Sequence, residues 1–179
     1  MAEAGADETS AERVIVDSYQ PDANFVSARR VDVAATPERV WEVLPDLPVA
    51  LRSSLVAKVG AVPLLFASLL RGEHGRGAVE FGRTPWTFRE GVVLAGAFVV
   101  DRVDPGREVV LVGRHRIAEF ATNFYIEPMG GGRSRLYNVT RAKFRTTGLG
   151  HIYLAGVHVF HNLYVDRWLR ALKRRAESG

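Results

Sequence analysis

The chain has 179 residues, of which 47% are hydrophobic and 25% are charged, a balance typical of one globular domain with a sizeable core. It contains no cysteine, which excludes disulfides, thiolate nucleophiles and thiolate metal sites. The net charge is +4, but the first 20 residues carry −4 and the rest of the chain carries +8. Much of this positive charge lies on the outer face of the last helix, which lacks the interleaved aromatic residues that stack on bases, so nucleic acid is not an expected partner.

The N-terminus is rich in small and acidic residues and has no hydrophobic periodicity up to about residue 13. We therefore predict a flexible acidic tail over residues 1–20 and a single domain over residues 21–179. A short strand beginning at residues 14–16 is an alternative for the end of this tail. The segment has neither the basic nor the apolar region of a secretory signal, so a cytoplasmic location is expected.

A strand and a short helix are expected to open the domain. Residues 24–34 alternate between apolar and polar side chains, which predicts a strand. Thr36 is a good N-cap and Pro37 suits the first helical position, so residues 37–44 are predicted to be helical. The buried face of this helix is expected to consist of Val40, Trp41 and Leu44.

Residues 49–70 form the most apolar stretch, but Lys58 and Pro63 interrupt it. A membrane span needs about 20 uninterrupted apolar residues, so we expect two helical pieces buried against the domain. Insertion into a membrane surface is the alternative. The glycines that follow at residues 72–77 indicate a loop and lack a complete phosphate-binding fingerprint.

The chain from residue 78 to residue 144 has the pattern of an antiparallel meander. Turn signals stand at Asp104-Pro105-Gly106 and at the glycine run 130–132. The strands are expected at residues 78–81, 86–89, 98–103, 108–116, 120–127 and 135–144.

Alternation assigns one face of these strands to the interior. The inward rows are Val109, Leu111, Gly113 and His115; Phe120, Thr122, Phe124 and Ile126; and Leu136, Asn138, Thr140, Ala142 and Phe144. A face built only for packing has no need of four polar residues, because each costs free energy when it is buried without a partner.

Residues 148–177 are predicted to form one long amphipathic helix. A helix of roughly 28 residues is about 40 Å long, so it must lie across a broad element, for which the sheet is the candidate. Its basic residues near the C-terminus fall on the opposite face, where a solvated surface is the expected role. The apolar stripe consists of Leu154, Val157, His161, Tyr164, Val165, Trp168 and Leu172.

The strand that leads into Ala34-Ala35-Thr36-Pro37-Glu38-Arg39-Val40-Trp41, the insertion, the meander and the terminal helix together resemble the helix-grip fold of the START-like superfamily, also called SRPBCC. The resemblance covers residues 24–177 and implies an α+β fold in which a curved antiparallel sheet wraps around the long helix, with short helices between the first two strands. It also implies an apolar cavity between sheet and helix. Members bind lipids, sterols, polyketides or other apolar molecules, and some, such as polyketide cyclases, act on them.

The expected ligand site lies in that cavity, and His161 and His115 are its candidate acid–base residues. For both, a structural hydrogen bond inside the core is the alternative role. His158 and His161 are spaced three apart but lack a clear third ligand, so no metal site or cofactor is expected. The expected lining is His161, His115, Asn138, Thr140, Thr122, Phe124, Phe120, Leu111, Trp86, Phe88, Val157, Tyr164 and Trp168.

The sequence therefore predicts a protein that binds a hydrophobic or amphipathic small molecule, such as a lipid, polyketide or isoprenoid. One alternative is a cyclase or dehydratase that uses a cavity histidine as general acid or base. Another is a lipid carrier associated with a membrane surface, which residues 49–70 and the basic helix face motivate.

Overall fold

A computed structural model describes residues 15–47, 85–94, 98–115, 118–144 and 149–179. The side chains of residues 15, 17, 115 and 149–160 are not among the described ones. The apolar segment 49–70, the glycine loop 72–77 and the expected strand 78–81 lie outside the described residues, as do residues 1–14 of the expected tail.

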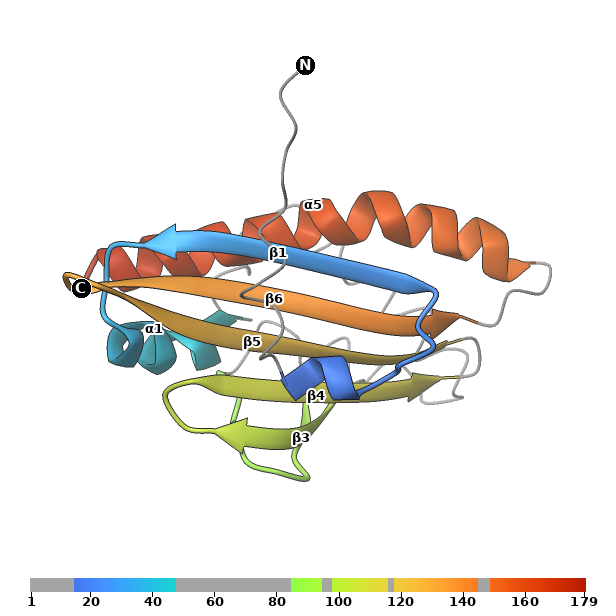
Figure 1. The fold of residues 1–179 in the computed structure, drawn as a ribbon, viewed down its shortest axis with the longest axis horizontal. Helices are drawn as coiled ribbons and strands as arrows, with labels where there is room; N and C mark the ends of the chain where they lie inside the picture. Colours follow the sequence, from blue (N-terminus) through green and yellow to red (C-terminus); the bar gives the residue numbers. More distant parts are fainter. Residues whose placement is uncertain (1–14, 48–84, 95–97, 116–117, 145–148) are drawn as a thin grey trace, which may run out of the picture.

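One antiparallel sheet dominates the fold (Figure 1). Its strands lie in the order β1-β6-β5-β4-β3-β2, so the chain runs as a meander from β2 to β6 and returns to place β1 at the edge beside β6. The predicted meander is confirmed. The strands are β1 Phe25–Val33, β2 Val93–Leu94, β3 Phe98–Asp104, β4 Glu108–His115, β5 Ala118–Gly130 and β6 Arg133–Phe144.

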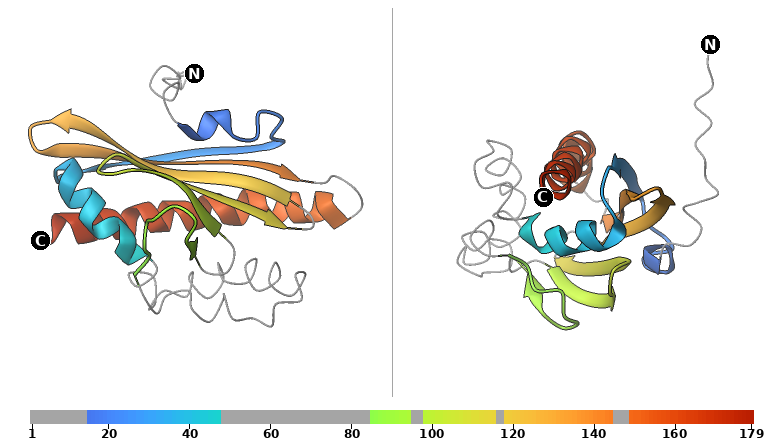
Figure 2. Two further views of the ribbon diagram at one scale, coloured as in Figure 1. Left: turned by 90° about the horizontal axis from the view of Figure 1, so that it is seen from below. Right: turned by 90° about the vertical axis from the view of Figure 1, so that its left-hand side faces the viewer.

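The long helix α5 (Leu149–Glu177) runs along the sheet, and the short helix α1 (Pro37–Val43) lies on the same side (Figure 2). Thr36 caps α1 as predicted, because its hydroxyl oxygen accepts a hydrogen bond from the backbone N–H of Arg39. A short 3₁₀ helix, η3 (Leu44–Asp46), follows. This arrangement of a curved sheet, a short helix after the first strand and a long terminal helix is the predicted helix-grip fold.

Residues 86–89 were predicted to be a strand, and that prediction is wrong. The segment is not paired with another strand. Its backbone is bonded to the short helix η3 instead, because the N–H of Trp86 donates a hydrogen bond to the carbonyl oxygen of Pro45. The side chain of Trp86 is nevertheless buried. An alternating pattern identifies extended backbone but cannot show whether another strand lies beside it.

The predicted alternation of faces is confirmed by the core. The inner face of the sheet, with α1 and α5, encloses the main cluster of buried side chains. It includes inward residues from three strands, namely Val109 and Leu111 of β4, Phe124 and Ile126 of β5, and Leu136 of β6. The register places Phe124 opposite Asn138 and Ile126 opposite Leu136, so the two rows share one face.

The outer face carries a second, smaller cluster that the N-terminal segment covers. Helix η2 (Ile15–Ser18) lies on the side of the sheet opposite α5 (Figure 2). Val16 is fully buried among Val110, Ala121, Tyr125, Tyr137 and Val139. Val16 and Tyr19, assigned from sequence to the tail, are therefore packed on the sheet, and residues 15–18 form a 3₁₀ helix, where a strand was the alternative.

Polar contacts fasten α5 along the edge strand β1. Lys173 donates to the carbonyl of Asp32 at 2.6 Å, and Glu177 accepts from the backbone N–H of Ala34 at 2.7 Å. These contacts occupy backbone groups at the end of an edge strand, which otherwise invite pairing with another chain.

The contact of Glu177 predicts a pH dependence. The backbone N–H of Ala34 and then Lys173 hold the pKa of Glu177 below its usual 4.5. Because the folded pKa is lower than the unfolded one, the stabilisation is present above about pH 4.5 and is lost as the pH falls through the folded pKa. Glu177→Gln should therefore melt below the parent protein at neutral pH and match it in acid. A deficit that is equal at every pH would contradict this assignment.

Candidate ligand-binding site

Three polar side chains on the inner face form a closed ring of hydrogen bonds. The amide nitrogen of Asn138 donates to the hydroxyl of Thr122 at 3.0 Å, and the hydroxyls of Thr122 and Thr140 lie 2.7 Å apart. The hydroxyl of Thr140 reaches the amide oxygen of Asn138 at 3.4 Å. When each hydroxyl donates to the next acceptor, every hydroxyl proton of the ring is used. These residues, predicted from sequence as site residues, lie together, with their donors directed at one another.

Two further polar contacts join β1 to the middle of α5. The hydroxyl of Ser27 donates to the amide oxygen of Asn162 at 2.8 Å. The guanidinium of Arg29 pairs with both carboxylate oxygens of Asp166, at 2.7 and 2.5 Å, and this partner raises the pKa of Arg29 above its usual value. Neither pair is predicted by the sequence patterns. The period-two row of β1 indicates that Ser27 and Arg29 face inward, but their partners lie more than 130 residues away.

His161 faces the sheet from α5. Its ring packs edge-on against Phe25 of β1, with centroids 5.2 Å apart, and its Nδ1 atom is shielded from solvent. The side chain as a whole is part-exposed. The inward orientation expected from the helical stripe is therefore present at His161. The side chain of the other candidate, His115, lies outside the described set, as does that of Val157.

Aromatic side chains form a continuous layer between the sheet, α1 and α5. Trp86 contacts Phe88, Phe98 and Trp168, with ring centroids 6.1 to 6.5 Å apart. Phe124 stacks on Trp168 at 6.1 Å with 28° between the planes. Trp41 of α1 contacts Phe88 at 6.0 Å. The layer thus brings together residues from α1, the segment 86–89, β3, β5 and α5, and all of them except Trp41 and Phe98 were predicted from sequence as site residues.

Phe120 extends the layer over β4. Its ring lies across Gly113, where a Cβ atom would stand 2.1 Å from the ring, so any larger residue at this position would require the Phe120 ring to move. The ring also contacts Phe98 at 5.3 Å. The neighbouring inward residue of β4, Leu111, is fully buried within the core cluster. A glycine in a strand often marks such a close approach.

Tyr164 packs against Trp168, with ring centroids 4.1 Å apart. Its side chain is part-exposed, but its hydroxyl oxygen is buried and makes no hydrogen bond of ordinary geometry. Burial raises the pKa of Tyr164 well above 10, so the phenol stays protonated at physiological pH. The side chain of Trp168 acts in the opposite direction and lowers this pKa, but burial is the larger effect.

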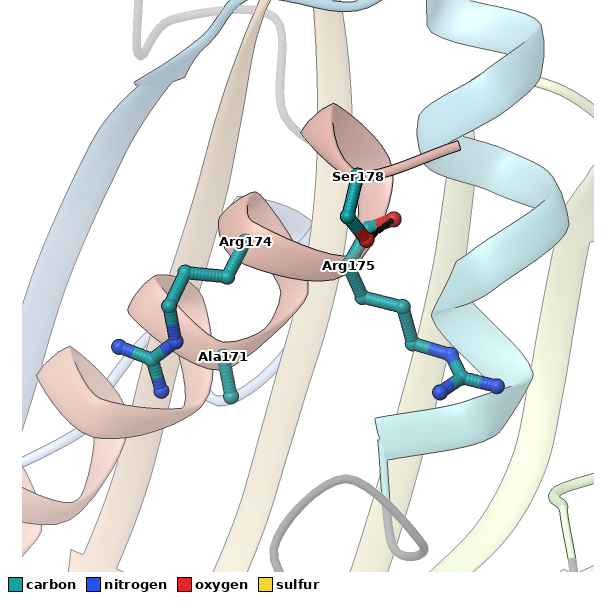
Figure 3. A pocket seen from close by; sticks show the side chains of 4 residues that line it. All are labelled: Ala171, Arg174, Arg175 and Ser178. Atoms are coloured by element: carbon teal, nitrogen blue, oxygen red, sulfur yellow. Dashed lines mark hydrogen bonds between the residues drawn. The ribbon is translucent and has the colours of Figure 1, made fainter.

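A shallow, open hollow of about 320 Å³ lies elsewhere, on the last turns of α5. Ala171, Arg174, Arg175 and Ser178 line it, and Figure 3 shows the two arginines pointing in different directions. Arg175 reaches toward α1 and pairs with Asp46 of η3 at 2.6 Å. This hollow contains none of the predicted site residues, and its openness makes it a poor match for a small-molecule site.

Among the described residues, no three histidine or acidic side chains are grouped so as to hold a metal ion. No helix in the described part of the chain combines the length and apolarity that a membrane span requires.

The chain is similar to solved structures that have the same fold. A START superfamily protein from Mycobacterium smegmatis is 12% identical, and the alignment covers 86% of this chain and 97% of that one with a TM-score of 0.49. The Zhui aromatase/cyclase from Streptomyces sp. R1128 is 17% identical, with 86% and 93% covered and a TM-score of 0.48. At these identities the likeness concerns the fold alone. No protein-family model and no curated protein sequence matches the chain.

Proposed function

We propose that the protein binds an apolar or amphipathic small molecule between the inner face of the sheet and α5. Small-molecule sites are mostly apolar and aromatic, with a few hydrogen-bonding groups that fix orientation. The inner side of this fold has both kinds of group. The aromatic layer extends from Trp41 to Phe120, and the polar contacts of β1, β5 and β6 lie on the same inner face.

The observation that carries the proposal is the partial exposure of aromatic side chains that pack on the inner core. Trp41, Phe88, Phe98 and Tyr164 contact that core, yet each keeps part of its surface accessible. Large aromatic surfaces lose favourable free energy when they remain in contact with water. An apolar ligand that covers them would recover that free energy, at about 25 cal/mol per Å² of apolar surface removed from water.

The first test is extraction of the purified chain. Protein prepared under native conditions is denatured, extracted with organic solvent and analysed by mass spectrometry, with Phe98→Ala prepared in parallel. We expect a co-purifying apolar compound at near-stoichiometric amount in the parent protein and a reduced amount in the variant, because the variant loses part of the aromatic wall.

The matched control is Leu163→Ala, on the solvent side of α5, where the side chain is 54% exposed. It should retain the compound at the parent level. An equal loss of the compound from both variants would indicate non-specific binding to the protein surface instead of an internal site. The proposal would be wrong if the parent protein contained no co-purifying compound and no apolar compound raised its melting temperature.

A further inference from the structure

Several polar side chains on the inner face of the sheet are hydrogen-bonded to other protein groups. The ring of Thr122, Asn138 and Thr140 uses its hydroxyl protons internally. Ser27 donates to Asn162, and Arg29 is occupied by Asp166. Buried polar groups are normally paired in this way, because an unpaired one destabilises the fold.

The hydroxyl of Tyr164 departs from this rule. Its oxygen is buried, and no described side chain or backbone carbonyl lies in position to accept its proton. The neighbouring indole of Trp168 cannot do so, because an indole nitrogen donates a hydrogen bond and accepts none. Phenylalanine would fill the same space without the cost of an unpaired hydroxyl. The hydroxyl proton of Tyr164 therefore has no acceptor among the described residues.

We infer that the hydroxyl of Tyr164 anchors the ligand of the proposed function by donating a hydrogen bond to a neutral oxygen, such as a ketone or quinone carbonyl, on a flat ring system. This inference rests on the proposed function and adds the ligand's chemical class to it.

The class follows from the surroundings of Tyr164. The ring of Tyr164 packs on Trp168, which in turn stacks on Phe124, so the tyrosine belongs to an aromatic cluster, and aromatic rings pack favourably against other rings. A carboxylate ligand is disfavoured, because the guanidinium on the inner face of the described strands, that of Arg29, already binds Asp166 through both oxygens. A carboxylate brought among these rings would lose its hydration, and the guanidinium of Arg29 would have to leave Asp166 to compensate for it.

The test compares three probes on one scaffold: ethylnaphthalene, acetylnaphthalene and naphthoate, each substituted at the same ring carbon. Binding to the full chain is followed by quenching of tryptophan fluorescence, in the parent protein and in Tyr164→Phe. The parent should bind the ketone most tightly. Loss of one neutral hydrogen bond should weaken ketone binding by roughly three- to tenfold in Tyr164→Phe, while ethylnaphthalene binding stays unchanged.

The infrared carbonyl stretch of bound acetylnaphthalene gives a second reading of the same bond. A hydrogen bond to the carbonyl lowers its frequency, so the band should lie lower in the parent protein than in Tyr164→Phe. The control is Tyr137→Phe, whose hydroxyl donates to Glu127 on the outer face at 2.8 Å. That variant should leave all three affinities and the band unchanged.

Stability without ligand tests the premise independently of binding. Because an unpaired buried hydroxyl is removed, ligand-free Tyr164→Phe should melt at or above the temperature of the parent. A clearly lower melting temperature would overturn the inference, since it would mean that the protein already supplies the acceptor. If both uncharged probes bind the parent protein and Tyr164→Phe does not selectively weaken ketone binding, the role of the Tyr164 hydroxyl is overturned. The proposed function would not be affected by that result. Failure of the parent to bind any probe would overturn both.

Discussion

Replacement of Trp168 by alanine is expected to lower the free energy of unfolding by about 3–5 kcal/mol, the usual cost of removing a large buried aromatic side chain. Trp168 is 5% exposed, and its ring is in contact with Trp86, Phe124 and Tyr164. The indole joins the sheet to α5, so its removal leaves a void that these neighbours cannot fill without moving. Equilibrium denaturation followed by circular dichroism measures the change.

The effect on ligand binding should exceed the effect of Tyr164→Phe. Trp168 supports one face of the Tyr164 ring at 4.1 Å, so its loss removes part of the aromatic wall and leaves the tyrosine free to change position. Trp168→Ala should therefore weaken ketone and hydrocarbon probes alike. The exposed Leu163→Ala on the same helix should change stability by less than about 0.5 kcal/mol. Comparable losses in the two variants would refute the assignment of Trp168 to the interior layer.

A second large effect is expected on the opposite side of the sheet. Val16→Asp places a carboxylate where the native side chain is fully buried against Val110, Ala121 and Tyr125. An unpaired charge in such a site costs on the order of 3 kcal/mol or more, so the variant should either unfold more easily or release η2 from the sheet.

The control for this prediction is Val26→Asp, the same exchange at a strand position that is 52% exposed. Its cost should stay below about 1 kcal/mol, the range of strand propensity. Hydrogen exchange of β4 and β5 amides distinguishes the two outcomes at Val16, since release of η2 raises exchange locally and global destabilisation raises it throughout. If Val16→Asp behaved like Val26→Asp, η2 would not contribute to the fold.

The two faces of the sheet have different roles in this picture. The outer face is covered by a short segment of the chain itself, from Val16 to Tyr19. The inner face is covered by α5 and α1, which leave part of the aromatic surface of Phe98 and Phe88 accessible. The small-molecule site that we propose therefore lies on the inner side, under the long helix.

Much of this architecture follows from patterns within short stretches of sequence. The period-two rows of β4, β5 and β6 predicted which residues face inward, and the core contains Leu111, Phe124 and Leu136 as expected. The Thr36-Pro37 junction predicted the start of α1. These predictions succeeded because the spacing of side chains along one helix or strand is fixed by local backbone geometry.

Boundaries and partners were harder to predict. Residues 86–89 have the composition of a strand but bond to η3, and Val16 belongs to a segment whose composition is that of a tail. In both places a contact with a distant part of the chain decided the structure. Local propensity is only a weak guide when tertiary contacts of that kind are available.

The sequence by itself determined the order of the elements, the inward faces of the strands and the presence of polar residues among apolar ones. Only the tertiary structure decided which of those polar residues satisfy one another. Arg29 pairs with Asp166 because the fold places α5 beside β1. Thr122 is hydrogen-bonded to Thr140 because the register of β5 and β6 places them opposite each other. Tyr164 is left with a buried hydroxyl and no acceptor among the described residues. A hydrogen bond requires two groups to lie within about 3 Å in three dimensions, and spacing along the chain does not contain that information.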